Sequence, residues 1–255
     1  GGDLREILPY WPEALAGRTR AWIAERVLAG DLRGVDFALR ARPDAMPDYE
    51  LSLDFEGVRL LALPELPPIE GGAGYLRLRG PEFVLRLDEG QMWREGGLAV
   101  ALDGSSMQIA DTRQRGPDAV FDLSLAGELQ DVLSILTRPP VRLFQNGTMT
   151  PERIGTGGVT AQARIETRLM RQEGLGNTRF AVSAEVGGLV SEGLVPGRRL
   201  SAQRLAVTVD PERIEIAGAA EFDNVPLSGR WARALGPGAE AVSRVEARAL
   251  LSRER

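Results

Sequence analysis

The stretch Tyr75-Leu76-Arg77-Leu78-Arg79-Gly80-Pro81-Glu82-Phe83-Val84-Leu85-Arg86-Leu87-Asp88 decides the fold class. Apolar and charged residues alternate on both sides of Gly80-Pro81. Successive side chains of a β-strand point to opposite faces, so this period indicates half-buried strands. The stretch therefore predicts two short antiparallel strands joined by a turn, with one apolar and one polar face.

The same two-residue period runs through most of the chain. Turn signals such as Asp103-Gly104 and Asp210-Pro211 separate the apolar runs. We therefore expect a mainly β protein, built as a long antiparallel meander of short amphipathic strands over residues 35–126 and 140–255. Residues 239–255 have helical propensity, but the alternation of Val245, Ala247 and Ala249 predicts a strand over 241–250.

Two segments have helical spacing instead. Residues 12–30 begin with Pro12 and end at Gly30, and they predict an amphipathic N-terminal helix. Leu129, Val132 and Leu133 are spaced three and four residues apart, which predicts a short helix over 127–138 before Pro139-Pro140.

The composition excludes several classes of function. The 255 residues include no histidine and no cysteine, and all 31 basic residues are arginine. Ser-His-Asp triads, Cys-His pairs, thiolate metal sites and Schiff-base lysines are therefore excluded. The net charge is −5, whereas nucleic-acid-binding domains usually carry a basic surface. We therefore expect no nucleic-acid partner. Carboxylates such as Asp88, Asp111 and Asp131 are expected to be solvated, and we predict no enzyme activity, cofactor or metal.

Periodicity alone leaves two ways to hide the apolar strand faces. The sheet can close over a dry core, which periodicity alone favours, or curl into an open trough that meets an apolar ligand. The trough would be lined by the apolar strand positions, which are Leu76, Leu78, Phe83, Leu85, Leu87, Leu98, Val100, Leu102, Met107, Ile109, Phe121, Leu123, Leu125, Ile165, Phe180, Val182, Leu205, Val207, Ile214 and Ile216.

Several segments resemble a known family. These are Leu8-Pro9-Tyr10-Trp11-Pro12 with the helix after it, Leu60 to Pro68, Gly71 to Leu76, Gly127 to Leu133 with Arg138-Pro139-Pro140, Leu194 to Arg198, and Val225 to Trp231. In this order and spacing they resemble a domain of the AsmA-like, YhdP-type family of Gram-negative envelope proteins. The family's tyrosine-leucine-proline segment is altered here to Leu61-Ala62-Leu63-Pro64.

The resemblance implies a function without catalysis. It implies an interior piece, spanning residues 1–255, of a long periplasmic protein whose parent is anchored in the inner membrane. It implies a body curled into an open, taco-like groove that carries phospholipids between the inner and outer membranes and maintains the outer-membrane barrier. The expected partners are phospholipids, the remaining domains of the same chain, and inner- and outer-membrane proteins as candidates.

The resemblance shifts our expectation from the dry core to the groove. The alternative is a closed-core structural or assembly module of the envelope that binds protein partners. Such a core predicts many large aromatic residues on the inner face, whereas the chain has only 4 Trp, 3 Tyr and 7 Phe. Arg77, Arg79, Arg86 and Arg94 could meet lipid phosphates, although we expect ordinary solvent-facing roles for them.

Overall fold

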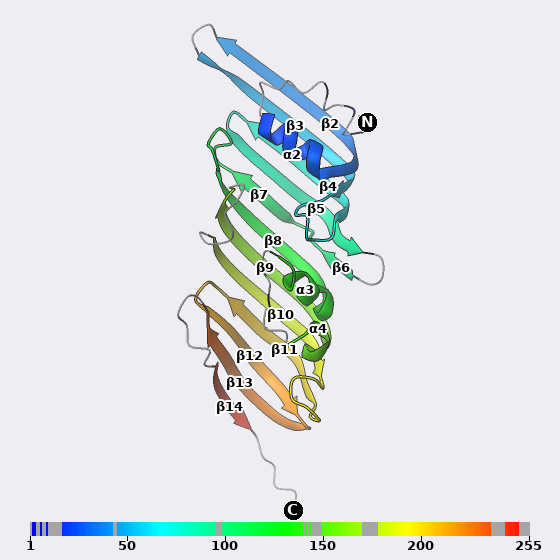
Figure 1. Cartoon of the computed structure of the whole chain (residues 1–255), viewed down its shortest axis with the longest axis vertical. Helices are drawn as coiled ribbons and strands as arrows, with labels where there is room; N and C mark the ends of the chain where they lie inside the picture. Colours follow the sequence, from blue (N-terminus) through cyan, green and yellow to red (C-terminus); the bar gives the residue numbers. More distant parts are fainter. Residues whose placement is uncertain are drawn as a thin grey trace, which may run out of the picture. The chain divides into compact units, whose positions relative to one another are not determined.

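The computed structural model describes residues 2–3, 6, 9, 17–42, 45–94, 98–139, 141, 143, 149–169, 178–235 and 243–249. The strands among them form one 14-stranded antiparallel sheet. Figure 1 labels the helices and most of the strands. The helices and strands are β1 (Gly2–Asp3), α2 (Gly17–Arg26), β2 (Val27–Arg42), β3 (Ala45–Leu60), β4 (Ile69–Arg79), β5 (Glu82–Arg94), β6 (Leu98–Ala101), β7 (Ser105–Ile109), β8 (Asp118–Glu128), α3 (Leu129–Leu136), α4 (Pro151–Ile154), β9 (Thr156–Arg168), β10 (Arg179–Ser191), β11 (Leu200–Val209), β12 (Arg213–Phe222), β13 (Val225–Ala234) and β14 (Ser243–Ala249).

The sheet is a meander in which almost every strand pairs with its neighbours in sequence. The order is β1-β2-β3-β4-β5-β6-β8-β9-β10-β11-β12-β13-β14, and β7 pairs with β5 and β8. The mainly β, antiparallel meander predicted from the sequence is confirmed. No described helix is long and apolar enough to span a bilayer.

Contacts divide the chain into two compact units. Unit 1 contains residues 1–123 and 166–178, and unit 2 contains residues 124–165 and 179–255. The sequence predicted a single continuous body. Each unit is described below by itself.

Unit 1 has a packed apolar core on one face of its sheet. Ile23 of α2 is buried in a cluster with Leu53, Leu76 and Phe83 of three strands. The strand register explains the cluster, because it places Leu53 opposite Leu76 and Leu76 opposite Leu85. The helix thus covers the apolar face that the alternation predicts, while Arg77 and Arg79 are exposed on the other face.

The N-terminal helix is shorter than the sequence predicts. The expected helix over 12–30 is α2 over Gly17–Arg26, and residues 27–30 already belong to β2. Residues 10–16 lie outside the described part. Gly30 is not a helix terminator but a point of close approach, because a Cβ there would lie 2.5 Å from Cγ2 of Val58. A side chain at position 30 would therefore clash with β3.

Unit 2 has fewer buried residues, and they gather around its helices and first strands. The helix predicted over 127–138 is α3, whose Leu129, Val132 and Ile135 are buried. Its neighbour α4 was not predicted. Val159 of β9 and Val186 of β10 are also buried, whereas every residue of β14 is exposed. The strand predicted over 241–250 is confirmed as β14.

Candidate functional site

The predicted lining residues of unit 1 divide by burial. Six of them are buried in the core, namely Leu76, Leu78, Phe83, Val100, Leu102 and Ile109. Leu85, Leu87, Met107 and Phe121 are half-buried and pack against that core. The side chain of Leu98 lies outside the described part. Leu78 is 1% exposed and Val100 is 0% exposed, so these two side chains present almost no surface to a ligand.

The predicted lining residues of unit 2 are placed differently. They are Leu125, Ile165, Phe180, Val182, Leu205, Val207, Ile214 and Ile216, and all are half-buried. Leu123, at the end of unit 1, is half-buried as well. A half-buried apolar side chain keeps part of its surface available for contact with an apolar ligand.

The register of β10 to β13 aligns these side chains in rows. Val207 lies opposite both Ala184 and Ile216. Ile216 in turn lies opposite Trp231, so one row crosses four strands. A second row runs from Val182 through Val209 to Ile214. Together the rows form one apolar face, which we call the β10–β13 face.

Four residues of this face or its margin were absent from the predicted lining. Ala184, Val209 and Trp231 are half-buried, and Val186 is buried. Each of them lies an even number of residues from a predicted lining residue, or opposite one on the next strand, and therefore points to the same face. The alternation in the sequence could have identified them. Trp231 adds a large amphipathic ring, the type of side chain that suits a boundary between apolar and aqueous surroundings.

The opposite face of the same strands carries charged side chains joined by ion pairs, and Ala232 among them is buried. Arg204 forms an ion pair with Glu185 at 3.0 Å. Glu215 accepts from Arg213 at 2.6 Å and from Arg230 at 2.9 Å. A hollow of about 170 Å³ lies among Arg213, Arg230, Ala232, Arg244 and Glu246. It is smaller than the pockets of about 300–1,000 Å³ that usually hold organic ligands.

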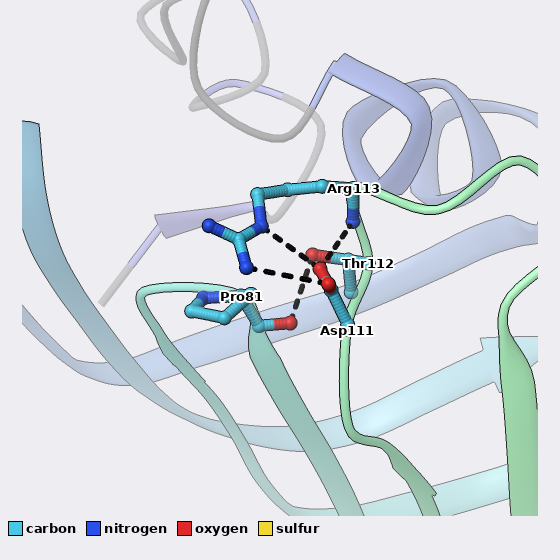
Figure 2. Close-up of polar contacts among 4 residues, drawn as sticks. All are labelled: Pro81, Asp111, Thr112 and Arg113. Atoms are coloured by element: carbon cyan, nitrogen blue, oxygen red, sulfur yellow. Dashed lines mark hydrogen bonds and ion pairs between the residues drawn. The ribbon is translucent and has the colours of Figure 1, made fainter. Parts of the chain in front are cut away.

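Four carboxylates among the described residues have a lowered pKa, and each of them accepts local hydrogen bonds. The Arg113 guanidinium and the Arg113 backbone N–H both donate to Asp111, and they lower the pKa of that carboxyl (Figure 2). A general base or acid needs a pKa near the working pH, so this shift has the wrong direction. The backbone N–H and hydroxyl of Thr112 each donate to the carbonyl oxygen of Pro81 at 2.9 Å. These contacts connect the loop after β7 to the β4–β5 turn.

The other lowered carboxyl pKa values also have local structural causes. Arg33 lowers the pKa of Glu56 through a hydrogen bond between β2 and β3. The backbone N–H of Arg199 and the side chain of Arg198 lower the pKa of Asp223 at the β12–β13 turn. The hydroxyl of Thr150 lowers the pKa of Glu152 at the start of α4. Within the described ranges, no three acidic residues come close enough to hold a metal ion.

Among the described residues, strands β10 to β13 offer an apolar surface made of aligned, half-buried side chains. Comparison of the chain with family models, with curated proteins and with solved structures finds no match. The β10–β13 face is the strongest candidate site because its half-buried side chains form aligned rows on adjacent strands.

Proposed function

We propose that the β10–β13 face binds the acyl chains of phospholipids. The chain would then be a non-catalytic segment of a periplasmic lipid carrier that moves phospholipids between inner and outer membranes and maintains the outer-membrane barrier. The observation that carries the proposal is the half-buried row from Ala184 through Val207 and Ile216 to Trp231. The sequence resemblance to AsmA-like envelope proteins supports the same function.

The physical basis is burial of hydrocarbon without specific contacts. Each CH₂ group that leaves water gains about 0.8 kcal/mol. The rows consist of Val, Ile and Ala side chains together with Trp231. The aliphatic side chains accept a methylene chain at any point along its length. A headgroup could stay in water, because the strands alternate between apolar residues and exposed residues such as Thr208 and Arg204.

The test is photo-crosslinking in cells, in the full-length protein that contains this chain. The photo-reactive residue is placed at Val207, and separately at Thr208 as the matched control. The two positions are adjacent on β11, but Val207 is half-buried and Thr208 is exposed on the other face. We expect lipid attached at position 207 and not at position 208. Lipid at neither position, with the same result at Ile216 and Ala217, would exclude lipid binding by this face.

A second candidate is a closed-core structural module of the envelope that binds protein partners. The observation in its favour is the core of unit 1, where α2 covers side chains that the groove hypothesis placed in contact with lipid. Photo-crosslinkers at Leu85 and Arg86 on β5 distinguish the two candidates for this unit. Protein adducts at Arg86 with no lipid at Leu85 would favour the structural module, and lipid at Leu85 would favour the carrier.

A further inference from the structure

One charged residue lies on the β10–β13 face. The pairing of β12 with β13 sets Arg233 directly opposite Ile214, so the second row, which begins at Val182, ends at an arginine. Facing residues of an antiparallel pair share a face of the sheet, and Arg233 therefore points to the same side as Trp231. The Arg233 side chain is exposed. The row thus joins an apolar surface to a permanent positive charge.

The other charged residues of β11 to β14 lie on the opposite face. By register they are Arg204, Arg213, Arg230, Arg244, Arg248, Glu215, Glu221 and Glu246. Glu185 of β10 also points to that face, because it alternates with Ala184. No acidic residue of the described strands β10 to β14 therefore shares a face with Arg233. Arg233 forms no ion pair with another residue in the described part of the chain.

A guanidinium group without a carboxylate partner is suited to binding a phosphate group. Arginine presents N–H donors in a planar fork that matches the oxygens of a phosphate. Its hydrogen bonds to phosphate are charge-assisted and can form in pairs. The phosphate of a phospholipid is joined to the acyl chains through a single glycerol unit. A lipid whose chains lie along the rows through Val207 and Ile214 can therefore bring its phosphate to Arg233.

Two neighbours of Arg233 add further donors at the end of the row. Trp231 lies two residues earlier on the same face and is half-buried. Its indole ring combines a large apolar surface with one N–H donor, which suits the boundary between acyl chains and a headgroup. Ser243 of β14 lies opposite Arg233 and is exposed, and its hydroxyl can also donate.

The apolar rows favour a lipid phosphate over a free phosphate ion. Water and salt screen the charge of an exposed arginine, so a free ion gains little from one guanidinium. A lipid gains in addition from the burial of its hydrocarbon on the same face.

We infer that Arg233 binds the phosphate group of an anionic lipid whose acyl chains lie on the β10–β13 face. The inference rests on the proposed function and adds the residue that holds the headgroup. Because no carboxylate of β10 to β14 shares this face, the ammonium group of phosphatidylethanolamine has no ionic partner there. Phosphatidylglycerol, which carries a net negative charge, should therefore bind better than phosphatidylethanolamine.

The test uses the full-length protein that contains this chain, purified with a photo-reactive residue at Val207. It is incubated below saturation with phosphatidylglycerol, or with diacylglycerol that has the same acyl chains, and mass spectrometry quantifies each lipid adduct. Arg233→Gln should lower the phosphatidylglycerol adduct at least about threefold, because a charge-assisted contact is lost. The diacylglycerol adduct should not change, because this lipid has no phosphate.

The matched control is Arg244→Gln. Arg244 is exposed on the neighbouring strand, and it points to the opposite face because it lies opposite Ala232. The substitution removes the same charge and should leave both adducts unchanged. An equal loss of the phosphatidylglycerol adduct in the two variants would overturn the inference, since net charge rather than position would then be the cause.

A third probe tests the charge of the headgroup. Phosphatidylethanolamine with the same acyl chains should give less adduct than phosphatidylglycerol in the wild-type background, and Arg233→Gln should reduce this difference. Equal yields from the two lipids before the substitution would overturn the selection of anionic headgroups.

Failure of this inference and failure of the proposed function give different results. Adducts of both phosphatidylglycerol and diacylglycerol that are unchanged by Arg233→Gln would retain lipid binding and overturn the role of Arg233. Absence of every lipid adduct at position 207 before the substitution would overturn the proposed function and this inference with it.

Discussion

At the scale of single residues, the β12–β13 turn shows how short polar side chains fix a hairpin. Asp223 and Asn224 both have positive φ angles, 47° and 68°. A two-residue hairpin turn of this kind matches the twist of its strands and favours Asn, Asp and Gly. Val225 and Pro226 pair with Phe222 and Glu221 of β12, so the turn itself consists of Asp223 and Asn224.

The charge of Asp223 should make the turn sensitive to acid. Its carboxylate accepts from the Arg199 backbone N–H at 2.9 Å and from the Arg198 guanidinium at 2.6 Å, and its pKa is lowered. A lowered pKa stabilises the fold above the unfolded value of about 3.9, and this contribution is lost as the pH falls towards the folded value. Asp223→Asn should therefore unfold more easily in urea at pH 6 and lose less stability between pH 4 and pH 2.

The control for this prediction is Arg198→Gln. It removes the smaller of the two main causes and leaves the Arg199 N–H, so its pH dependence should lie between those of the wild type and Asp223→Asn. Asparagine tolerates a positive φ, so the variant changes the charge and retains the turn. Identical pH profiles for all three proteins would contradict the prediction.

At the scale of elements, the helix α3 was recognised in the sequence by the three- and four-residue spacing of its apolar residues, which differs from the two-residue spacing of the strands. Leu129 and Val132 of the predicted apolar face are buried, whereas Leu133 is half-buried and Ile135 is buried in its place. The N-terminal helix was predicted less well, because Val27 and Leu28 fit both helical and strand spacing. Their place in β2 follows from pairing with β3, which places Val27 opposite Leu60 and is not visible in local sequence.

The helix α3 should contribute strongly to the stability of unit 2. Leu129 is 6% exposed, and Leu129→Ala should lower the free energy of unfolding by about 2–5 kcal/mol. Gln130 is the adjacent, half-buried control. Gln130→Ala should change stability by less than about 0.5 kcal/mol, since alanine is a good helix former and no buried apolar group is lost. Urea unfolding of both variants measures the difference, and equal losses would mean that α3 does not anchor the unit.

At the scale of the whole molecule, the sequence predicted strand parity but not burial. Leu76 and Val207 have the same pattern of alternating neighbours, yet Leu76 is 4% exposed and Val207 is half-buried. The difference depends on what covers each face, and α2 covers the first. A local sequence pattern contains no information about which distant element packs on a strand face. Periodicity alone therefore could not distinguish a dry core from an open groove.

The uneven burial predicts uneven hydrogen exchange. Amides of β4, which contains the buried Leu76 and Leu78, should exchange slowest. Amides of β14, where every residue is exposed, should exchange fastest among the long strands, because local opening there disrupts few buried contacts. Hydrogen–deuterium exchange with mass spectrometry at peptide resolution measures the order. Slower exchange in β14 than in β4 would show that the edge strand is protected by an additional contact.

The half-buried β10–β13 face also affects the temperature dependence of folding. Unfolding raises the heat capacity mainly by exposing apolar surface to water. Val182, Val207 and Ile216 keep part of their surface exposed in the folded state. Unfolding of unit 2 therefore exposes less additional apolar surface per residue than unfolding of a domain in which a second layer covers the sheet. The curve of its unfolding free energy against temperature should therefore be broad and shallow, because a smaller heat-capacity change gives less curvature.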